Sequence, residues 1–534
     1  MADISSGLSY RRPQKDEKLS QRYQTLHNKK GDMLRRCEDY SMWTLPYIFP
    51  VEGTRHTELN GPVDSTGARA VNHLSNKLIM TLFQPHNPFF RLMVQDDVLN
   101  EFKALAEQGD EEATQILADL DQQLADAEKA AMRELDYNTY RTEATMVAKS
   151  LIVTGNALIY HPEKGKGRVQ SYSLRDYCVV RDLSGNVVEI ITRDKKALFT
   201  FSKDVIETLR KSNNKKYDKD NCDVTLYTHL LLKEDGKFHL RQSADDVPLD
   251  STGSWTPDDL PWIPLTWNLV RGEDYGRGLV EDYAGAFHAL YVLNNALVDL
   301  VGIAADIKFL VNPQSVLDVA ELNKAESGTY HSGQEGDITT VQLGGKQFDI
   351  AIVEAAVERF QRQIAQAFLL NSATTRDAER VTAEEIRMVA NELEMSHGGI
   401  YSRFAEEWQF KTAKLMLKRI NVTIGKDKLL YPQIITGLDS LSRAGDLDNL
   451  RLFVSDMSLL DAVPEEVRAV IDPHRFAQFI GIRRGVDYDK FLKTPAQLQR
   501  EQQAAMATQG EMMEQEASAK MAVEAGKQAM KESN

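Results

Sequence analysis

The residues of this chain best suited to hold a charged ligand are Arg376 and Arg380, in the segment LLNSATTRDAERVTAEE that begins at Leu369. Exposed guanidinium groups contact phosphates through charged hydrogen bonds, each of them weak in salt. Helical patterns flank the segment, so we expect a loop held out on two rigid arms. Asn371 and Asp377 are the other polar candidates in this loop. An ordinary surface loop between two helices is the alternative interpretation.

Motifs for catalysis are missing from the chain. The fragments nearest to a phosphate-binding loop, GGK at 344–346 and GK at 425–426, lack the upstream glycine and the hydroxyl residue. The eleven histidines have no second ligand at helical spacing, and no Gly-x-Ser-x-Gly elbow occurs. Asp176, Asp182 and Asp194 are interpreted as turn residues, with nuclease carboxylates as the alternative. We therefore expect no enzyme, no cofactor and no metal site.

Helical periodicity defines the arm before the loop, at residues 349–369. Its apolar residues recur at three- and four-residue steps, which places them in one stripe along a helix. Arg359 and Arg362 fall outside that stripe. The stripe consists of Ile350, Val353, Val357, Phe360, Ile364 and Phe368.

The arm after the loop has a clear start signal. The Thr382 hydroxyl can accept from the amide of Glu385, whose carboxylate can reach back to the Thr382 amide. From there the apolar pattern continues to about Ile420. Gly398 and Gly399 interrupt it, and we expect a kink there because glycine weakens helix interiors.

A further long helix is predicted from Leu279 to about Ile307, with one apolar side. No Lys or Arg occurs between Arg277 and Lys308. A channel wall that must not bind a polyanion needs this composition, because basic side chains would hold the polyanion in place. A buried helix would show the same composition. The acidic residues of this segment are Glu281, Asp282, Asp299 and Asp306.

The remaining patterns predict an α+β fold that is mainly helical. Helices are expected up to about Tyr47 and at 68–83, 111–135 and 140–153, and more helix after Gly425. Between the two long helices, residues 312–346 are rich in glycine, with a short strand expected at 339–343. From Arg168 to Gln242 the period changes to two, which is typical of strands. These strands are expected at 169–174, 178–181, 187–193, 224–232 and 237–241, with an Asp235-Gly236 hairpin turn before the last.

Composition limits the classes of function. The net charge of −15 argues against a protein that grips nucleic acid with a basic face, yet it suits one past which DNA slides. We expect no membrane segment, because the sequence contains no uninterrupted run of about 18 apolar residues. The basic run from Arg210 is interpreted as a solvated loop and the Trp-Pro segment 255–267 as aromatic packing. DNA contact and base stacking are their respective alternatives.

Several segments resemble, in the same order, the portal (head-to-tail connector) proteins of short-tailed bacteriophages that encode their own RNA polymerase. They are LLNSATTRDAERVTAEEIRMVANELE from Leu369, GARAVNHLSNKLIMTLFQPHNPFFRL from Gly67, VAKSLIVTGNALIYHPE from Val147, YCVVRD from Tyr177 with GNVVEIITRD following, and DYGRGLVEDY from Asp274. No single string is a chemical motif. Their number, order and spacing carry the resemblance, which extends from about Lys15 to Val486.

The resemblance implies a portal fold with wing, stem, clip and crown regions, assembled as a ring of about twelve copies around a central DNA channel. It implies a wing at 1–275, a stem helix at 276–307, a clip at 308–348 and a second stem helix at 349–369. The remaining regions are a channel loop at 370–381, a long wing helix at 382–430, and a crown with a C-terminal tail at 431–534.

The implied function is that of a portal vertex subunit through which double-stranded DNA is packaged and ejected. The implied partners are other copies of the chain, DNA in transit, terminase, scaffolding and major capsid protein, tail adaptors and internal core proteins. The implied location is the virion, after synthesis in the host cytoplasm. The channel-wall candidates are the four acidic residues of the first stem helix with Arg359 and Arg362. The partner-docking candidates in the clip are Glu326, Tyr330, His331 and Asp337.

Two alternatives remain open. The first is a helical ring or scaffold protein of a virion that does not contact DNA. The second concerns the loop alone: Arg376 or Arg380 would pair with Asp377, Glu379 or a carboxylate on a neighbouring stem, and would only fix the position of the loop.

Overall fold

The computed structural model describes residues 17–53, 61–84, 88–94, 111–165, 167–211, 215–218, 222–305, 308–315, 318–341, 347–370, 383–420, 432–435, 451–458, 475–477 and 479–480. The chain forms two compact units, Met1–Ser440 and Leu441–Asn534. In the second unit, residues 451–458 are helical, inside a segment where the sequence predicts helix.

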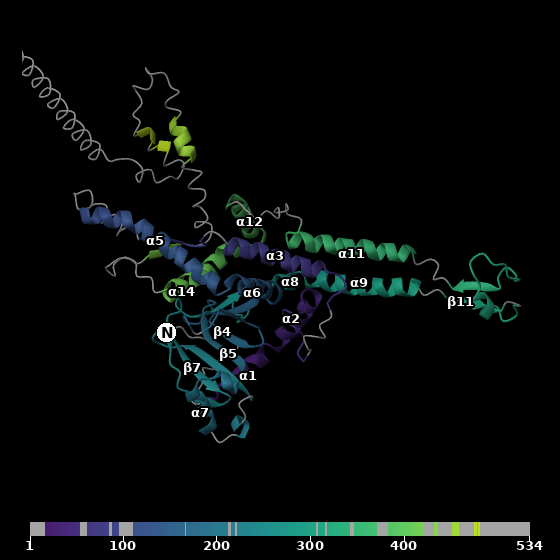
Figure 1. The fold of residues 1–534 in the computed structure, drawn as a ribbon, viewed down its shortest axis with the longest axis horizontal. Helices are drawn as coiled ribbons and strands as arrows, with labels where there is room; N and C mark the ends of the chain where they lie inside the picture. Colours follow the sequence, from purple (N-terminus) through teal and green to yellow (C-terminus); the bar gives the residue numbers. More distant parts are fainter. Residues whose placement is uncertain are drawn as a thin grey trace, which may run out of the picture. The chain divides into compact units, whose positions relative to one another are not determined.

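An antiparallel sheet occupies the N-terminal half of the first unit (Figure 1). The strands are β4 (Tyr177–Arg181), β5 (Val187–Ala197), β6 (Asp223–Leu232), β7 (Phe238–Ala244) and β8 (Val247–Leu249), in that order, with β9 (Ser254–Trp255) paired to β7. A longer segment with short helices joins β5 to β6, whereas short turns join β4 to β5, β6 to β7 and β7 to β8. The predicted Asp235-Gly236 turn is confirmed. Gly236 takes a φ of +72°, and the Asp235 carboxylate accepts a hydrogen bond from the amide of Lys237 (3.0 Å).

A second antiparallel sheet has the order β10-β2-β3 and supplies part of the core. Two of its strands were not predicted: β2 (Asn156–Tyr160) and β10 (Trp262–Thr266) are too short and too apolar to show alternation. The third strand is β3 (Gln170–Tyr172). Trp262 is buried and its ring stacks on Tyr160 at 4.4 Å, so the packing interpretation of the Trp-Pro segment is confirmed at this residue.

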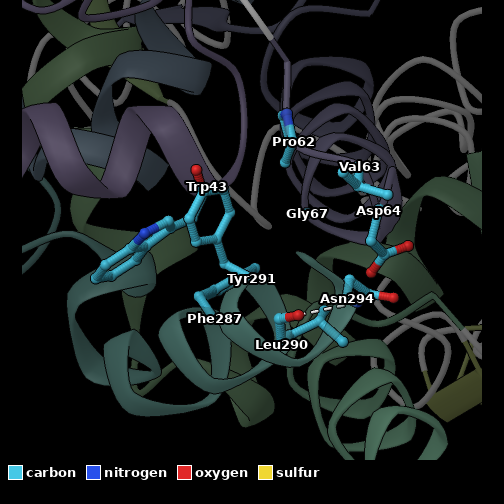
Figure 2. Close-up of a pocket in the computed structure, with 9 residues that line it drawn as sticks. All are labelled: Trp43, Pro62, Val63, Asp64, Gly67, Phe287, Leu290, Tyr291 and Asn294. Atoms are coloured by element: carbon cyan, nitrogen blue, oxygen red, sulfur yellow. Dashed lines mark hydrogen bonds between the residues drawn. The ribbon is translucent and has the colours of Figure 1, made fainter. Parts of the chain in front are cut away.

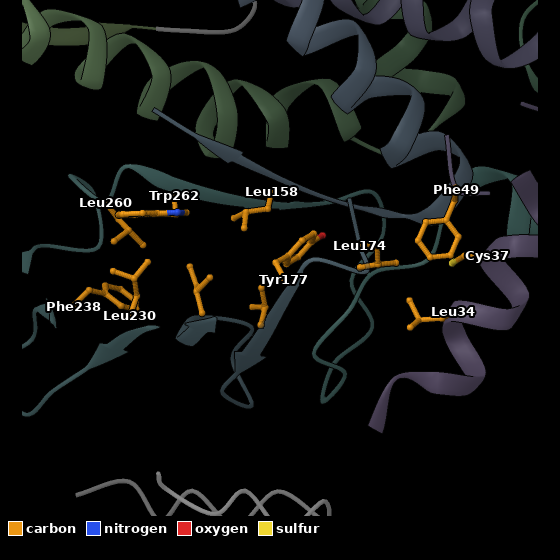
Figure 3. Close-up of a cluster of buried hydrophobic side chains, with 12 residues drawn as sticks. Leu34, Cys37, Phe49, Leu158, Leu174, Tyr177, Leu230, Phe238, Leu260 and Trp262 are labelled. Carbon is orange, nitrogen blue, oxygen red and sulfur yellow. The ribbon is translucent and has the colours of Figure 1, made fainter. Parts of the chain in front are cut away.

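The main core lies between the two sheets and one N-terminal helix (Figure 3). Burying such apolar side chains contributes roughly 1.5 to 3 kcal/mol each. Figure 3 shows side chains from several elements converging on one layer. They are Leu34, Cys37, Phe49, Leu158, Leu174, Tyr177, Val179, Ile190, Leu230, Phe238, Leu260 and Trp262.

A buried ion pair attaches the first helix, α1 (Leu19–Lys29), to the large sheet. The Arg22 guanidinium donates to both carboxylate oxygens of Glu189 on β5, at 3.0 and 2.6 Å. His229 on β6 lies 3.0 Å from the same carboxylate. Burial alone would raise the pKa of Glu189, yet the hydrogen bonds from His229 and Arg22 lower that pKa to about 2. The carboxylate is therefore charged at neutral pH and fully paired.

Helices cover the remaining faces of the first unit. The predicted helices before Tyr47 and at 68–83, 111–135 and 140–153 are confirmed. They are α1 with α2 (Gly31–Trp43), then α3 (Thr66–Leu82), α5 (Glu111–Tyr137) and α6 (Tyr140–Thr154). Shorter elements are β1 (Arg91–Val94), paired with β13 (Pro432–Ile435), η2 (Leu198–Thr200), α7 (Lys203–Lys211) and η3 (Lys215–Asp218).

Three glycines join these helices to the long-helix region. Gly155 ends α6 with a φ of +76°, and a Cβ there would lie 2.4 Å from the backbone of Arg277 and Gly278. The Asn156 side chain accepts from the amide of Gly276 and donates to its carbonyl oxygen, both at 2.8 Å. Two strings far apart in sequence, TGNAL and YGRGL, therefore meet backbone to backbone.

The first long helix is broken, which corrects the prediction of one continuous helix. A short α8 (Leu279–Asp282) ends at Tyr283, and α9 (Ala284–Ala305) continues. Helix α11 (Gln347–Ala367) runs beside α9 in the opposite direction, since Phe368 packs on Tyr283 and Phe287 near the start of α9 (Figure 1). The apolar stripe predicted for α11 faces this contact, where Val357, Ile364 and Phe368 are buried.

The chain between α9 and α11 contains a small hairpin. Strand β11 (Lys308–Val311) pairs with β12 (Ile338–Val341), in register from Lys308 with Val341 to Val311 with Ile338. The short helix α10 (Val319–Leu322) lies between the strands in sequence, and the Asp318 side chain caps it. The predicted strand at 339–343 is thus part of a hairpin whose other strand was not predicted.

Helix α9 is the segment that bears on the expectation of no membrane segment. Residues Ala284–Gly302 are long and apolar enough to cross a membrane by length and composition, and 17% of this window is buried. Core helices of water-soluble proteins pass the same test. Asn294, Asn295 and Asp299 interrupt the apolar residues of this segment, so the sequence shows no continuous apolar run here.

The region after 382 is divided at the predicted glycines. Helix α12 (Ala383–Ser396) ends before Gly398 and Gly399, which take φ values of +63° and +81°. The chain resumes as α13 (Ile400–Phe404), a π-helical turn η4 (Ala405–Phe410) and α14 (Lys411–Arg419). Trp408 in the π-helical turn is buried and donates to the Tyr140 hydroxyl at 2.7 Å. The helix start predicted at Thr382 falls one residue before the described part of α12.

Candidate functional site

The site is built around the end of α11, where the chain leaves the helix pair. The amide of Leu369 donates to the Gln366 carbonyl oxygen at 3.2 Å, and the amide of Leu370 donates to that of Ala365 at 2.8 Å. This pattern is a Schellman end, which normally has glycine at the left-handed position. Here Leu369 holds that position with a φ of +56°. A side chain makes this conformation costly, by about 1 to 2 kcal/mol.

Helix α3 contacts this strained end. His73 Nε2 lies 3.1 Å from the Leu369 carbonyl oxygen, and Lys77 Nζ lies 3.5 Å from the same oxygen. Four residues separate His73 from Lys77, so both project from one face of α3. Lys77 Nζ also lies 3.2 Å from the carboxylate of Glu392 on α12. The ammonium group thus links the end of α11 to α12.

The burial and charge of these side chains favour a fixed position for the end of α11. The Lys77 side chain is 7% exposed and that of Glu392 is 32% exposed, so the pair is partly withdrawn from solvent. Burial, and then the Lys77 ammonium, hold the pKa of His73 below its ordinary value, whereas its bond to Leu369 opposes that shift. His73 is therefore neutral at pH 7 and donates through Nε2–H.

The four predicted loop residues follow the end of α11 in sequence. Asn371, Arg376, Asp377 and Arg380 lie outside the described residues, and so does Asp306. Their roles stay predictions.

The predicted wall residues of α8 and α9 lie in different surroundings. Glu281 is 20% exposed and its carboxylate lies 3.8 Å from the Arg36 guanidinium of α2. Burial raises the pKa of Glu281 and of Asp282. Asp299 is exposed and is the one residue of α9 with a formal charge. Glu281 and Asp282 belong to α8, before the helix pair begins, whereas Asp299 lies on α9 itself.

Helix α11 carries the predicted basic wall residues. Arg359 and Arg362 are both exposed, and Arg362 donates to the Glu358 carboxylate at 2.8 Å. Several apolar side chains of the pair are also exposed. Val292, Val298, Val301 and Ile352 each expose about half of their surface, at 48%, 51%, 52% and 55%. A single subunit therefore leaves part of the apolar surface of α9 and α11 uncovered.

The clip candidates divide into two groups. Tyr330 is fully exposed, Glu326 and His331 are exposed, and His331 contacts the Thr329 hydroxyl at 3.1 Å. Asp337 is buried instead. Its carboxylate accepts from the amide of Gln334 at 2.6 Å and its carbonyl oxygen accepts from that of Asn312 at 2.9 Å. Asp337 stabilises the hairpin, whereas Glu326, Tyr330 and His331 form the exposed surface.

Two cavities border the α8–α9 region. A pocket of about 10 Å³, roughly the space of one water molecule, lies where α9 meets α2 and the loop before α3 (Figure 2). Figure 2 shows Phe287, Leu290 and Tyr291 of α9 close to Trp43. A larger cavity of about 390 Å³ borders α1, α2 and β4. It contains the paired charges Arg277 with Glu273 (2.9 Å) and Arg36 with Glu281 (3.8 Å).

Ligand sets for a metal ion are missing from the part of the chain that the structure describes. The turn interpretation of Asp182 is confirmed, because its carboxylate accepts from the amides of Ser184 (2.9 Å) and Asn186 (2.8 Å). Asp176 lies at a bend before β4, 3.0 Å from the Arg193 guanidinium. The turn interpretation of Asp194 is wrong, because Asp194 lies within β5, where it pairs with Leu226 of β6 and accepts from the Tyr172 hydroxyl at 3.2 Å. The free thiols of Cys37 and Cys178 are buried.

Sequence reasoning missed His73, Lys77 and Leu369. A signal was present: Lys77 lies between Leu74 and Leu78 on the apolar side of an otherwise clear amphipathic helix. A lysine at such a position must find a partner, because burying an unpaired ammonium is costly. The identity of that partner required the tertiary structure.

Comparisons of the sequence give a consistent result. A sequence model of the family described as "Bacteriophage head to tail connecting protein" matches residues 16–492. The portal protein of Enterobacteria phage SP6 is 34% identical over 517 residues, which cover 96% of this chain and 97% of that protein. The portal protein of Escherichia phage T7 is 32% identical over 472 residues, 86% of either chain. The portal protein of Pseudomonas phage phiKMV is 31% identical over 490 residues, 89% of this chain and 93% of that protein.

Solved structures show more distant likenesses. A chain from the neck of an empty GTA particle, computed with C6 symmetry, has a TM-score of 0.34 and 12% identity and covers 76% of this chain and 90% of its own length. A chain from the neck of a native GTA particle, computed with C12 symmetry, has a TM-score of 0.29 and 11% identity. It covers 62% of this chain and 79% of its own length.

Proposed function

We infer, because this chain belongs to the bacteriophage head-to-tail connecting protein family, that it is the portal vertex subunit of a phage capsid. In this role copies of the chain form a channel through which double-stranded DNA is packaged and ejected. The observation that carries the inference is the family match over residues 16–492, together with 34% identity to a portal protein along nearly the whole chain.

The helix pair α9 and α11 supports a ring. Its apolar side chains are only partly covered within one subunit, and neighbouring copies would cover them. The same need explains why α9 resembles a membrane span in composition. We propose that α8, α9 and α11 form the stem, that about twelve copies close the ring, and that Asp299, Arg359 and Arg362 contribute to its channel wall.

The remaining regions are assigned on the same basis. Residues 370–381, between α11 and α12, form a loop that faces the channel with Arg376 and Arg380. The β11–β12 hairpin and the chain around Tyr330 form the clip, the elements before α8 and after residue 382 form the wing, and residues from 431 onward form the crown and tail. Exposure of Tyr330 and His331 supports the clip as a docking surface.

The proposed partners follow from this position in the virion. Terminase docks during packaging. Scaffolding, major capsid and internal core proteins bind during assembly, and tail adaptors bind afterwards. The chain is synthesised in the host cytoplasm. It neither hydrolyses ATP nor cleaves DNA by itself, in keeping with a structural family.

Electron microscopy of the purified chain in physiological salt tests the proposal. We expect closed rings with a central hole wide enough for a DNA duplex. A monodisperse monomer of 60.2 kDa at micromolar concentration would contradict ring formation. A ring whose bore excludes a duplex in every state would favour the alternative of a virion scaffold without DNA contact.

A further inference from the structure

We propose that His73 and Lys77 of α3 are positioning residues that hold Leu369 in its left-handed conformation and thereby fix the direction in which the chain leaves α11. Both side chains approach the same carbonyl oxygen, at 3.1 and 3.5 Å. Neither residue belongs to α11 or α12. The direction of the chain between these helices is thus decided by a third helix.

Leu369 adopts a backbone conformation that its side chain disfavours. A φ of +56° on a branched apolar residue is uncommon and persists only where surrounding contacts impose it. Within α11 the left-handed turn is closed by the amides of Leu369 and Leu370. These two bonds form equally well with glycine, so they do not explain why leucine tolerates the position. The contacts from α3 supply the missing restraint.

The alternative conformation of Leu369 would change the end of α11. If Leu369 returned to a right-handed φ, its carbonyl oxygen would point along the helix axis and would lose its contact with His73. The amide of Leu370 would lose Ala365 as its acceptor, and α11 would continue past Ala367. The end of α11 therefore has two discrete states, and His73 stabilises the one observed.

Lys77 extends this restraint to α12. Its ammonium lies between the Leu369 carbonyl oxygen and the Glu392 carboxylate, at 3.5 and 3.2 Å. Because the Lys77 side chain is almost fully buried, a displacement of either helix would lengthen one of these two contacts at a place that is largely closed to water. Helices α11 and α12 are thus held at a fixed separation where residues 371–382 connect them.

Residue-level hydrogen–deuterium exchange on the assembled protein without DNA tests the proposal. In the His73→Ala variant we expect the Leu369 and Leu370 amides to exchange about tenfold faster, since their helix end loses a hydrogen bond. His73→Gln keeps a side-chain N–H donor and should restore most of the protection. Lys77→Met should accelerate the same amides, and Lys77→Arg should not.

Leu369→Gly gives the decisive comparison, because glycine adopts the left-handed conformation without strain. In this background His73→Ala should change exchange by less than about twofold. His288→Ala, the same replacement on the exposed side of α9, serves as the matched control and should leave both amides unchanged. Equal acceleration by His73→Ala in both backgrounds, or none in either, would overturn the proposal.

The functional consequence rests on the proposed portal role. Particles assembled with His73→Ala should retain packaged DNA differently from the parent, and Leu369→Gly should suppress that difference. Exchange that changes as expected while DNA retention does not would support the positioning role and contradict a channel role for residues 371–382. The two failures are therefore distinguishable.

Discussion

At the scale of single residues, buried polar groups decide how the first unit responds to pH. Arg22, Glu189 and His229 satisfy one another inside the large sheet. His161 differs, because both of its ring nitrogens are buried without a hydrogen-bond partner. Its ring lies 5.5 Å from that of Tyr140. Burial, and then the charge of Arg419, lower the pKa of His161 to about 3.

His161 should therefore make the fold sensitive to acid. Between the unfolded pKa of about 6.5 and the folded value, the unfolded chain binds one more proton, so stability falls as pH falls through this window. Above about pH 6.5 this loss is absent. We expect His161→Leu to reduce the loss of unfolding free energy between pH 6.5 and 4 by about 3 kcal/mol. Urea unfolding at several pH values measures it, with His288→Leu as control. If the unfolding free energy of His161→Leu and of the parent changed equally with pH, the prediction would be refuted.

At the scale of elements, the glycine junction determines how α6 and β2 join α8. The Gly155 backbone packs directly on residues 276–278, and Trp267 donates its amide to the Gly155 carbonyl oxygen at 2.8 Å. A side chain at this position would meet backbone atoms, which cannot yield as a flexible side chain would. The start of the long-helix region is therefore fixed by close backbone contact.

Gly155→Ala and Gly236→Ala form a matched pair, because their φ values are +76° and +72°. A Cβ at 236 has nothing within 4 Å, whereas one at 155 lies 2.4 Å from the Arg277 carbonyl carbon. We expect Gly236→Ala to cost about 1 kcal/mol and Gly155→Ala about 3 kcal/mol or more. Thermal unfolding measures both. Equal costs would show that conformation alone requires glycine at 155.

The β11–β12 hairpin provides the second test at this scale. Tyr330→Ala with His331→Ala removes exposed side chains and leaves the hairpin contacts of Asp337 intact. Rings should assemble normally, and their binding to motor or tail proteins should weaken about tenfold or more, as loss of an exposed aromatic anchor does. Pull-down with assembled rings measures this. Loss of assembly would assign the segment to subunit contacts, and unchanged binding would remove its docking role.

At the scale of the whole molecule, the net charge and the exposed apolar surface both favour a ring that DNA can pass through. The chain is acidic, α9 contains no Lys or Arg, and Val298 and Val301 are half exposed. In a ring these features give a wall that releases DNA and apolar contacts between neighbours. Arg376 and Arg380, repeated around the ring, would then be a band of positive charge that grips phosphate transiently.

Replacing Arg376 and Arg380 with alanine should therefore preserve ring assembly and alter the retention of packaged DNA. The effect should diminish as salt rises, since phosphate contacts are screened. DNA release from filled particles at several salt concentrations measures it. Lys195→Ala with Lys196→Ala, which removes the same charge from an exposed part of β5, is the control. Unchanged packaging and retention would refute the gating role, and failed assembly would favour a structural one.

The sequence by itself determined the elements that have a strong period and the family. The stripes of α3 and α11, the alternation in the first half of β6, the hairpin at Gly236 and the break at Gly398 follow from local rules. The portal resemblance, expressed in segments from several regions of the chain, agrees with the family match over residues 16–492.

Only the tertiary structure decided which distant residues meet. Strands β2 and β10 are too short to show a period, and their pairing defines them. The burial of Asp337 depends on the hairpin around it, and the break at Tyr283 divides an apolar pattern that continues through it. Leu369 takes a left-handed conformation that its own side chain disfavours, because His73 and Lys77, nearly 300 residues earlier, contact its carbonyl oxygen. Local sequence cannot encode a contact whose partner lies on another helix.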